Sequence, residues 1–167
     1  PVFWLEVAVI ATVVLAYLSR RPALRRADAP LEVILPLVAT ALPFGLALGP
    51  AGPRIAPAIG LTMSAGLALS LAGLLSLRRS FSILVEVRDL VVSGPYRWLR
   101  HPIYAGEIVA CAGVLALRFS ALTAAVFAAF VAVQVARALL EERKLSRALP
   151  AYAEYAKRTW RFVPAVW

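Results

Sequence analysis

Most of the side chains that could do chemistry lie within one short stretch, residues 94 to 107. The stretch holds the chain's single histidine together with two arginines, two tyrosines and a glutamate. In chain order these residues are Tyr96, Arg97, Arg100, His101, Tyr104 and Glu107. Imidazole and carboxylate groups can bind and release protons, and guanidinium groups bind anions such as carboxylates. Because the stretch runs directly into a long apolar segment, it indicates a functional site at a membrane boundary.

A second polar pair, Arg137 and Glu141, lies within another apolar segment. The two residues are four apart, so they lie on one face of a helix. An unpaired charge at that depth would be costly, which leaves two explanations. The pair is either a mutual salt bridge, or part of a pocket for a zwitterionic ligand. In such a pocket the ligand carboxylate would lie near Arg137 or His101, and its ammonium near Glu141.

The composition predicts an integral membrane protein. Hydrophobic residues make up 62% of the 167-residue chain, and the mean hydropathy is +0.80, whereas soluble domains are about 45 to 50% apolar. The net charge is +9. Basic residues that cluster beside apolar segments favour membrane lipids as the partner, and we expect no nucleic acid. A single cysteine, Cys111, excludes an intramolecular disulfide and a thiolate-rich metal site, and we expect no metal.

Five apolar segments predict an all-α, polytopic membrane protein with about five transmembrane helices. They cover residues 2–18, 31–48, 55–77, 103–117 and 121–140. The fourth would rise only about 22 Å, short for a hydrocarbon layer of about 30 Å. Aromatic and basic residues near the C-terminus predict an amphipathic cap on the membrane surface. We therefore expect one membrane domain over residues 1–167, in which residues 1–79 form three scaffold spans and residues 80–167 form a loop, a helical hairpin and the cap.

The distribution of basic residues predicts the orientation. If five spans alternate, the basic segments 20–26, 78–100 and 137–161 share one side, and they hold 16 of the 18 basic residues. The positive-inside rule then places the C-terminus and the polar stretch in the cytoplasm. A short turn between the last two spans would also bring His101 and Tyr104 beside Arg137 and Glu141. The composition, rich in Ala, Leu and Arg, indicates a bacterial gene, so we expect a bacterial inner (plasma) membrane protein.

Several segments in the second half of the chain resemble a known family signature. They are Asp89-Leu90-Val91-Val92-Ser93-Gly94-Pro95-Tyr96, Arg100-His101-Pro102-Ile103-Tyr104-Ala105-Gly106, Arg137-Ala138-Leu139-Leu140-Glu141-Glu142 and Tyr152-Ala153-Glu154-Tyr155. In order and spacing they resemble the integral-membrane methyltransferases typified by isoprenylcysteine carboxyl methyltransferase and the related phospholipid methyltransferases. The three N-terminal spans carry no such signature.

The resemblance implies S-adenosyl-L-methionine as the methyl donor. Carried over by position, the residues that would bind this cofactor are Asp89, Leu90, Val91, Tyr96, His101, Pro102, Ile103, Tyr104 and Glu141. Arg137 would face the methyl acceptor as the catalytic and substrate-binding residue. Arg88 stands where the eukaryotic enzymes often have histidine. Glu107 lies outside the signature, and is either a substrate contact or a partner for Arg100 or His101.

The implied activity is methyl transfer to a lipophilic acceptor that enters from the bilayer, most like isoprenylcysteine carboxyl O-methylation. An acceptor carboxylate is ionised at neutral pH and needs no base, so Arg137 would only orient it. An amine or thiol acceptor would need a proton acceptor, for which Glu107, Glu142 and His101 are the candidates. Phospholipid N-methylation, thiol S-methylation, a non-catalytic lipid-binding protein on the same scaffold and a purely structural membrane subunit remain alternatives.

Overall fold

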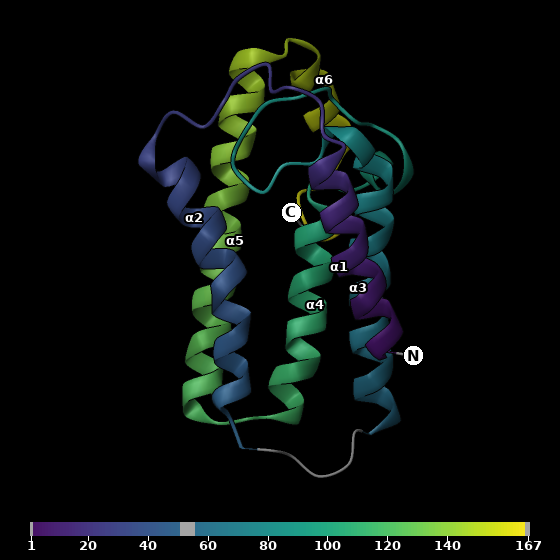
Figure 1. Cartoon of the computed structure of the whole chain (residues 1–167), viewed down its shortest axis with the longest axis vertical. Coiled ribbons are helices and arrows are strands. Elements are labelled where there is room, and N and C mark those ends of the chain that lie inside the picture. The colour runs from purple at the N-terminus through teal and green to yellow at the C-terminus, as the bar shows by residue number, and fades with distance from the viewer. Residues whose placement is uncertain (1, 51–55, 166–167) are drawn as a thin grey trace.

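The computed structural model describes residues 2–50 and 56–165, and this part of the chain is helical without strands. Its elements are α1 (Val2–Leu18), α2 (Pro30–Ala41), the 3-10 helix η1 (Leu42–Leu48), α3 (Pro57–Leu77), the short 3-10 turns η2 (Arg78–Ser80) and η3 (Gly94–Arg97), α4 (Pro102–Leu117), α5 (Ala121–Ala148) and α6 (Ala151–Arg158). Figure 1 shows the five longer helices running side by side as a bundle. The predicted all-α class is therefore confirmed.

Three of the five predicted spans are long and apolar enough to cross a membrane. They are Pro30–Leu48, Pro57–Ser80 and Ala121–Ala148, whereas Val2–Leu18 and Pro102–Leu117 are shorter apolar helices. The number five is thus approximate, because 16 residues in α4 rise only about 24 Å. The predicted third span begins at Pro57, and its expected first residue, Ile55, lies outside the described residues.

One predicted span differs from the structure for an identifiable reason. The segment 31–48 is not one α-helix, because Pro43 lacks the N–H that would continue the α-helical bonding, and the chain changes to the 3-10 helix η1 after Ala41. Helix α5 includes the charged residues that follow the apolar segment 121–140, and it continues to Ala148. Its last residues include Glu141, Glu142, Arg143 and Lys144, which are good helix formers and extend the helix beyond its apolar part.

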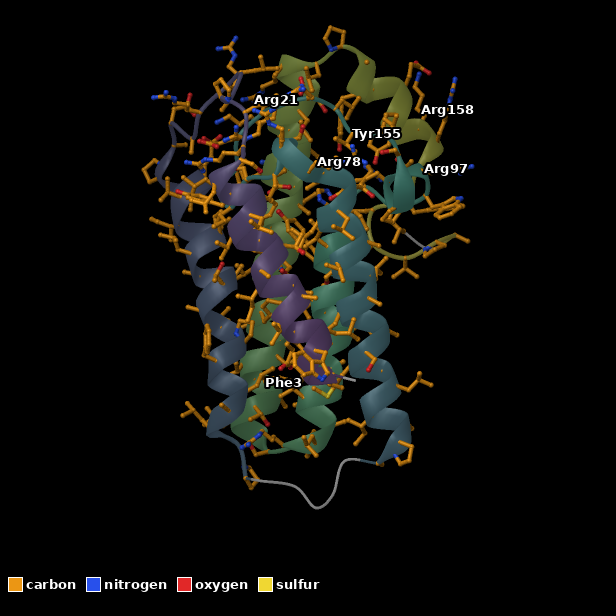
Figure 2. The ribbon with its side chains drawn as sticks, turned by 45° about the vertical axis from the view of Figure 1, so that its right-hand side comes forward. Phe3, Arg21, Arg78, Arg97, Tyr155 and Arg158 are labelled. Atoms are coloured by element: carbon orange, nitrogen blue, oxygen red, sulfur yellow. The ribbon has the colours of Figure 1, made fainter. Side chains whose placement is uncertain are left out.

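One end of the bundle collects the basic side chains. Figure 2 shows Arg21, Arg78, Arg97 and Arg158 at this end, while Phe3 lies toward the opposite end. We call it the basic end. Lys144 of α5 anchors the connection between α1 and α2 at this end. Its ammonium group lies 2.5 Å from the Glu32 carboxylate and 3.1 Å from the Asp28 carboxylate.

A three-residue turn at the opposite end joins α4 to α5, as predicted. Ser120 caps α5 by accepting a hydrogen bond from the Thr123 amide at 3.1 Å. The Thr123 hydroxyl in turn donates to the Arg118 carbonyl at 2.8 Å. These bonds satisfy backbone groups that a helix end leaves unpaired, so the hairpin turns tightly and sets α4 against α5.

The closest helix packing is between α3 and α4. The small residues Gly66, Ser70 and Gly73 face α4, as their spacing indicates, and Gly106 faces back toward them. A Cβ atom on Gly106 would lie 2.5 Å from the Gly66 carbonyl oxygen. The Ser70 hydroxyl also donates across the contact to the Ile103 carbonyl at 3.1 Å. Small residues and an interhelical hydrogen bond are how membrane helices approach each other closely.

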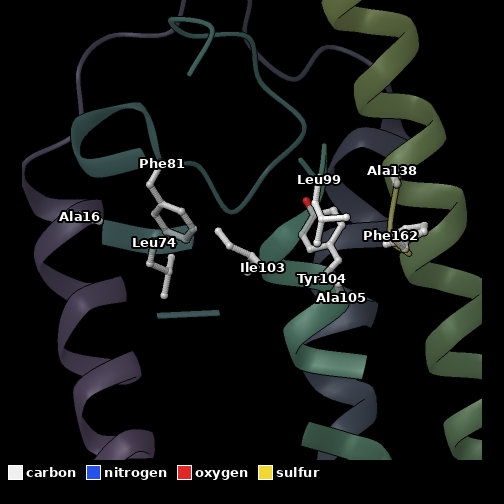
Figure 3. Packing of buried hydrophobic residues seen from close by; sticks show 9 residues of the cluster. All are labelled: Ala16, Leu74, Phe81, Leu99, Ile103, Tyr104, Ala105, Ala138 and Phe162. Atoms are coloured by element: carbon white, nitrogen blue, oxygen red, sulfur yellow. The ribbon is translucent and has the colours of Figure 1, made fainter. Parts of the chain in front are cut away.

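The hydrophobic core lies near the basic end and joins most of the elements (Figure 3). It consists of Ala16, Leu74, Phe81, Leu99, Ile103, Tyr104, Ala105, Ala138 and Phe162. The amphipathic helix α6 lies nearby, with Tyr152 buried while Lys157 and Arg158 remain exposed. Trp167, part of the predicted cap, lies outside the described residues.

The close α3–α4 contact predicts that a Gly→Ala substitution in α4 destabilises the protein. In most helix interiors, Gly→Ala stabilises a helix by up to about 1 kcal/mol. Gly106→Ala should instead lower the free energy of unfolding by about 1 to 3 kcal/mol, because the new methyl group would meet the Gly66 backbone. Denaturant titration in detergent, followed by circular dichroism, measures the change.

Gly45→Ala is the matched control. A Cβ at Gly45 would meet only the side chain of Val126, at 3.1 Å. This variant should lose less than about 1 kcal/mol. Equal stability of the two variants would contradict the proposed packing.

Candidate functional site

A cavity of about 270 Å³ lies at the basic end between the helices and the loop that follows α3. Ten of the eleven predicted site residues line it: Asp89, Leu90, Val91, Tyr96, His101, Ile103, Tyr104, Glu107, Arg137 and Glu141. Pro102 is buried but does not line the cavity; it begins α4 and packs toward Gly73 of α3. The fold therefore brings residues from the loop, α4 and α5 to one place.

A row of polar contacts joins α4 to α5 inside this cavity. The Tyr104 hydroxyl donates a hydrogen bond to Glu141. The Arg137 guanidinium lies over the Tyr104 ring, 4.6 Å from its centroid, and its Nε lies 3.3 Å from Glu141 Oε1. Arg137 also donates from Nη2 to the Ile83 carbonyl at 2.6 Å. The expected salt bridge between Arg137 and Glu141 exists, and it forms part of the cavity wall.

One turn deeper, Glu107 meets a residue that sequence reasoning missed. Gln134 of α5 donates from Nε2 to Glu107 Oε2 at 2.5 Å. Gln134 is fully buried, and its Oε1 has no hydrogen-bond partner. Its position three residues before Arg137, within an apolar segment, was the signal that could have found it. The suggestion that Glu107 pairs with Arg100 or His101 was wrong, because both of those residues bind Glu142 instead.

Glu142 is the centre of a charged cluster above the cavity. His101 Nε2 lies 3.1 Å from Glu142 Oε1, and Arg100 Nη1 donates to Oε2 at 3.0 Å. Arg161 donates to both oxygens, at 2.9 Å from Nε and 2.8 Å from Nη2. The imidazole also stacks on the Tyr104 ring, with centroids 5.3 Å apart. His101 is thereby held between the cluster and the cavity.

The loop from residue 81 to residue 93 forms the other wall. It is anchored by buried Phe81, Val85 and Val87. Val85 and Val87 donate backbone hydrogen bonds to Glu32 at 3.1 Å and to Arg25 at 2.9 Å. Asp89 lies at the rim, where its exposed carboxylate pairs with Arg21 at 2.8 Å.

Arg88 lies inside this loop and retains unused hydrogen-bond donors. Its side chain is buried, with 5% of its surface exposed, and Nη2 donates to Glu86 Oε2 at 2.7 Å. Nε and Nη1 have no hydrogen-bond partner. Burial alone would raise the pKa of Glu86, but hydrogen bonds from Ser82 and Arg88 outweigh it and lower that pKa, so Glu86 is ionised at neutral pH. Arg88 thus offers two buried donors beside the cavity, where an anion would satisfy them.

Two tyrosines outside the spans fix the turn that leads into α4. The hydroxyl of Tyr155 in α6 donates to the Tyr96 carbonyl at 3.0 Å. Burial raises the pKa of Tyr155 to about 12 and that of Tyr96 well above its usual value. Both side chains are therefore neutral donors at physiological pH. Tyr155 packs against Tyr152, with ring centroids 5.8 Å apart, and both residues line the cavity.

Comparison with known proteins identifies the family to which these features belong. Residues 58–147, more than half of the chain, match the sequence profile of the isoprenylcysteine carboxyl methyltransferase family. The chain belongs to this family. The match includes α3, the loop, α4 and nearly all of α5, which supply most of the cavity wall. Membership of the isoprenylcysteine carboxyl methyltransferase family confirms the resemblance described above and supports a membrane methyltransferase.

Two curated relatives share part of this region. The cobalt-zinc-cadmium resistance protein CzcN of Cupriavidus metallidurans is 42% identical over 76 residues, which are 45% of this chain and 35% of CzcN. The nickel-cobalt-cadmium resistance protein NccN of Alcaligenes xylosoxydans xylosoxydans is 39% identical over 77 residues, 46% of this chain and 36% of NccN. The chain thus matches about a third of each relative. Within residues 2–50 and 56–165, no group of three or more His, Cys, Asp or Glu residues is placed to hold a metal ion.

The Glu142 cluster predicts a large effect of one neutral substitution. Glu142→Gln keeps the side-chain size but removes the negative charge. Arg100, His101 and Arg161 then lose the charged acceptor to which all three bind. Breaking a largely buried ion pair costs about 3 to 5 kcal/mol. The variant should unfold at lower denaturant concentration, and its Arg100 and His101 amides should exchange hydrogen faster in mass spectrometry.

Glu154→Gln is the control, because Glu154 pairs with Lys157 on the surface, where both side chains are more than half exposed. An exposed pair contributes about 0 to 1 kcal/mol. If both variants left stability and exchange unchanged, the cluster would not hold the site together.

Proposed function

We propose that this protein is an integral-membrane methyltransferase that uses S-adenosyl-L-methionine and a lipophilic acceptor. The observation that carries the proposal is the convergence of polar groups on one cavity: the unpaired donors of Arg88 on one wall and the Glu141 carboxylate on the other. Family membership adds that most of this cavity is built from the family's own matched region. The site and the C-terminus are assigned to the cytoplasmic side of a bacterial inner membrane by the distribution of basic residues.

The residues of the cavity fit the polar end of the methyl donor. Glu141 would accept hydrogen bonds from its ammonium group, and the orphaned nitrogens of Arg88 would bind its carboxylate. His101, Tyr104 and the loop residues Leu90 and Val91 would surround the rest of the molecule. When bound, S-adenosyl-L-methionine supplies an electrophilic methyl carbon attached to a positively charged sulfur.

The chain's own residues would then act by alignment and by exclusion of water. The cavity is also lined by Val9 and Val13 of α1 and by Leu74 of α3, which suits an acceptor with a hydrocarbon part. Bringing two reactants together in a fixed, dry geometry lowers the barrier of a displacement reaction substantially. We assign Arg137 to the acceptor side, because its guanidinium pairs with Glu141 and also interacts electrostatically with the deeper Glu107.

Three reacting groups are compatible with a lipophilic acceptor. The family's name favours a carboxylate, which Arg137 would orient, whereas an amine or a thiol needs a proton acceptor. The metal-resistance names of the two relatives indicate no methyl acceptor, so the acceptor must be argued from the site. A lipid-binding protein that uses the same scaffold without catalysis is the alternative from another functional class.

Calorimetric binding of S-adenosylhomocysteine to the detergent-solubilised protein tests the cofactor assignment. We expect micromolar binding, and Glu141→Ala should weaken it about 10- to 100-fold, because a hydrogen bond to a charged group contributes about 1.5 to 3 kcal/mol. Glu154→Ala, which removes an exposed carboxylate, should bind as the unmodified protein does. Absence of binding by the folded, unmodified protein would favour the non-catalytic alternative.

A comparison of two ligands tests the role of Arg88. An S-adenosylhomocysteine analogue that lacks the carboxylate should bind the unmodified protein about 10- to 100-fold more weakly than the parent ligand. Arg88→Met should weaken binding of the parent ligand by a similar factor and leave binding of the analogue almost unchanged.

The exposed Arg97 supplies a matched control, since Arg97→Met removes a guanidinium that does not line the main cavity. Its binding of both ligands should equal that of the unmodified protein. Equal losses of both ligands in Arg88→Met would show that Arg88 supports the loop rather than the carboxylate.

A further inference from the structure

Within the part of the chain that the structure describes, Glu107 is an acidic cavity residue that forms no ion pair with a basic side chain. Its hydrogen-bond partner in the described chain is the neutral amide of Gln134, at 2.5 Å. Glu107 lies on the same face of α4 as Tyr104, three residues further along, and therefore about 4.5 Å deeper in the bundle. It lines the cavity, so its carboxylate is accessible to a ligand there.

The neighbouring arginine is already engaged. Arg137 lies 3.3 Å from Glu141, donates to the Ile83 carbonyl at 2.6 Å and lies over the Tyr104 ring. Glu141 and Glu107 both interact electrostatically with this one guanidinium. Two carboxylates thus share a single positive charge, and this part of the cavity carries a surplus negative charge when both are ionised.

Gln134 increases the excess of hydrogen-bond acceptors around Glu107. The amide is fully buried, and its Nε2 is used on Glu107 while its Oε1 remains without a donor. By donating to Oε2, Gln134 orients the carboxylate and leaves Oε1 available. A cationic group with several N–H donors would satisfy this environment, whereas an anionic group would be repelled by it.

We infer that Glu107 binds the ammonium group of a lipophilic amine, and that the methyl acceptor is this amine rather than a carboxylate. The inference rests on the proposed function and names its substrate class. Gln134 is a positioning residue, since it acts through Glu107. The apolar residues Val9 and Val13, which line the same cavity, would contact the hydrocarbon part of the amine.

The proton and electron balance of the step is complete with these groups. Glu107 takes one proton from the ammonium group and becomes a neutral carboxylic acid, which frees the nitrogen lone pair. The nitrogen forms a bond to the methyl carbon of the donor as the bond from that carbon to sulfur breaks, and the bonding electrons stay on sulfur. The product is the methylated ammonium ion, and Glu107 later returns its proton to water.

The positively charged sulfur of S-adenosylmethionine is a second cation that Glu107 could face. The depth of Glu107 in the bundle favours the amine of the methyl acceptor instead. Glu141, which suits the polar end of the donor, bonds to Tyr104, about one helical turn before Glu107, and Arg88 lies in the loop at the basic end. Glu107 therefore lies deeper in the bundle than either of them. The two assignments differ in one measurable respect. If Glu107 served the sulfonium, Glu107→Gln would weaken S-adenosylmethionine but not the uncharged thioether of S-adenosylhomocysteine.

The test uses three probes with the same ten-carbon chain: decylamine, decanol and decanoate. Each is titrated into the full-length protein in detergent with S-adenosylhomocysteine bound, at a neutral pH where decylamine is protonated. We expect decylamine to bind at least about tenfold more tightly than decanol, and decanoate to bind most weakly. Glu107→Gln, which keeps the size and the Gln134 contact, should abolish the preference for decylamine over decanol. Glu6→Gln, which removes an exposed carboxylate of α1, should retain it.

Transfer of labelled methyl groups from S-adenosylmethionine to decylamine is the second readout, and Glu107→Gln should reduce it about 100-fold or more. Binding of decylamine no tighter than decanol by the unmodified protein would overturn the inference, as would a preference that survives Glu107→Gln. Weakened binding of S-adenosylmethionine alone in that variant would also overturn it, by assigning Glu107 to the sulfonium. Failure of the unmodified protein to bind S-adenosylhomocysteine would instead refute the proposed function.

Discussion

The arrangement of the site depends on one carboxylate, that of Glu142. Three side chains from two distant segments converge on it: Arg100 and His101, which precede α4, and Arg161, which follows α6. A carboxylate has two oxygens and about four acceptor positions, so it can bind several donors at once. Because Glu142 is part of α5, these bonds fix the start of α4 and the C-terminal segment to the same helix. They thereby orient the neighbouring Glu141 toward Tyr104.

A division of labour between adjacent glutamates follows from helix geometry. Residues 141 and 142 differ by about 100° around α5, so one side chain faces the cavity and the other faces the charged cluster. His101 connects the two, since its Nε2 lies 3.1 Å from Glu142 and its Nδ1 lies 3.7 Å from Glu141. The imidazole of His101 therefore links the charged cluster around Glu142 to the carboxylate of Glu141, which faces the cavity. We expect a change of charge at either glutamate to affect the other through His101.

The sequence was sufficient to predict the parts of the fold that depend on local patterns. Apolar length and proline positions predicted the helices, and the three-residue turn after α4 placed Tyr104 beside Glu141. Ten predicted residues line the cavity, although their roles in binding remain predictions. The family signature contributed the loop residues, which have no periodicity that could place them.

Features that depend on long-range packing could not be predicted in this way. The pairing of His101 with Glu142 depends on the rotation of α5 against the start of α4, which no spacing rule fixes. Gln134 gave only a weak signal, because a lone amide in an apolar helix is compatible with many contacts. The buried position of Arg88 follows from the path of a loop held by Glu32 and Arg25, both far away in sequence.

The pairing of the C-terminal segment with the start of α4 has a consequence for biosynthesis. Arg100 donates its amide to the Trp160 carbonyl at 2.7 Å, His101 donates to Arg161 at 3.1 Å, and Trp160 donates back to Trp98 at 2.9 Å. These bonds join segments about sixty residues apart, and the later one leaves the ribosome after the five longer helices. Insertion of those helices into the membrane can therefore precede closure of the cavity. The newly made protein would remain open until Trp160 and Arg161 emerge and dock beside the histidine.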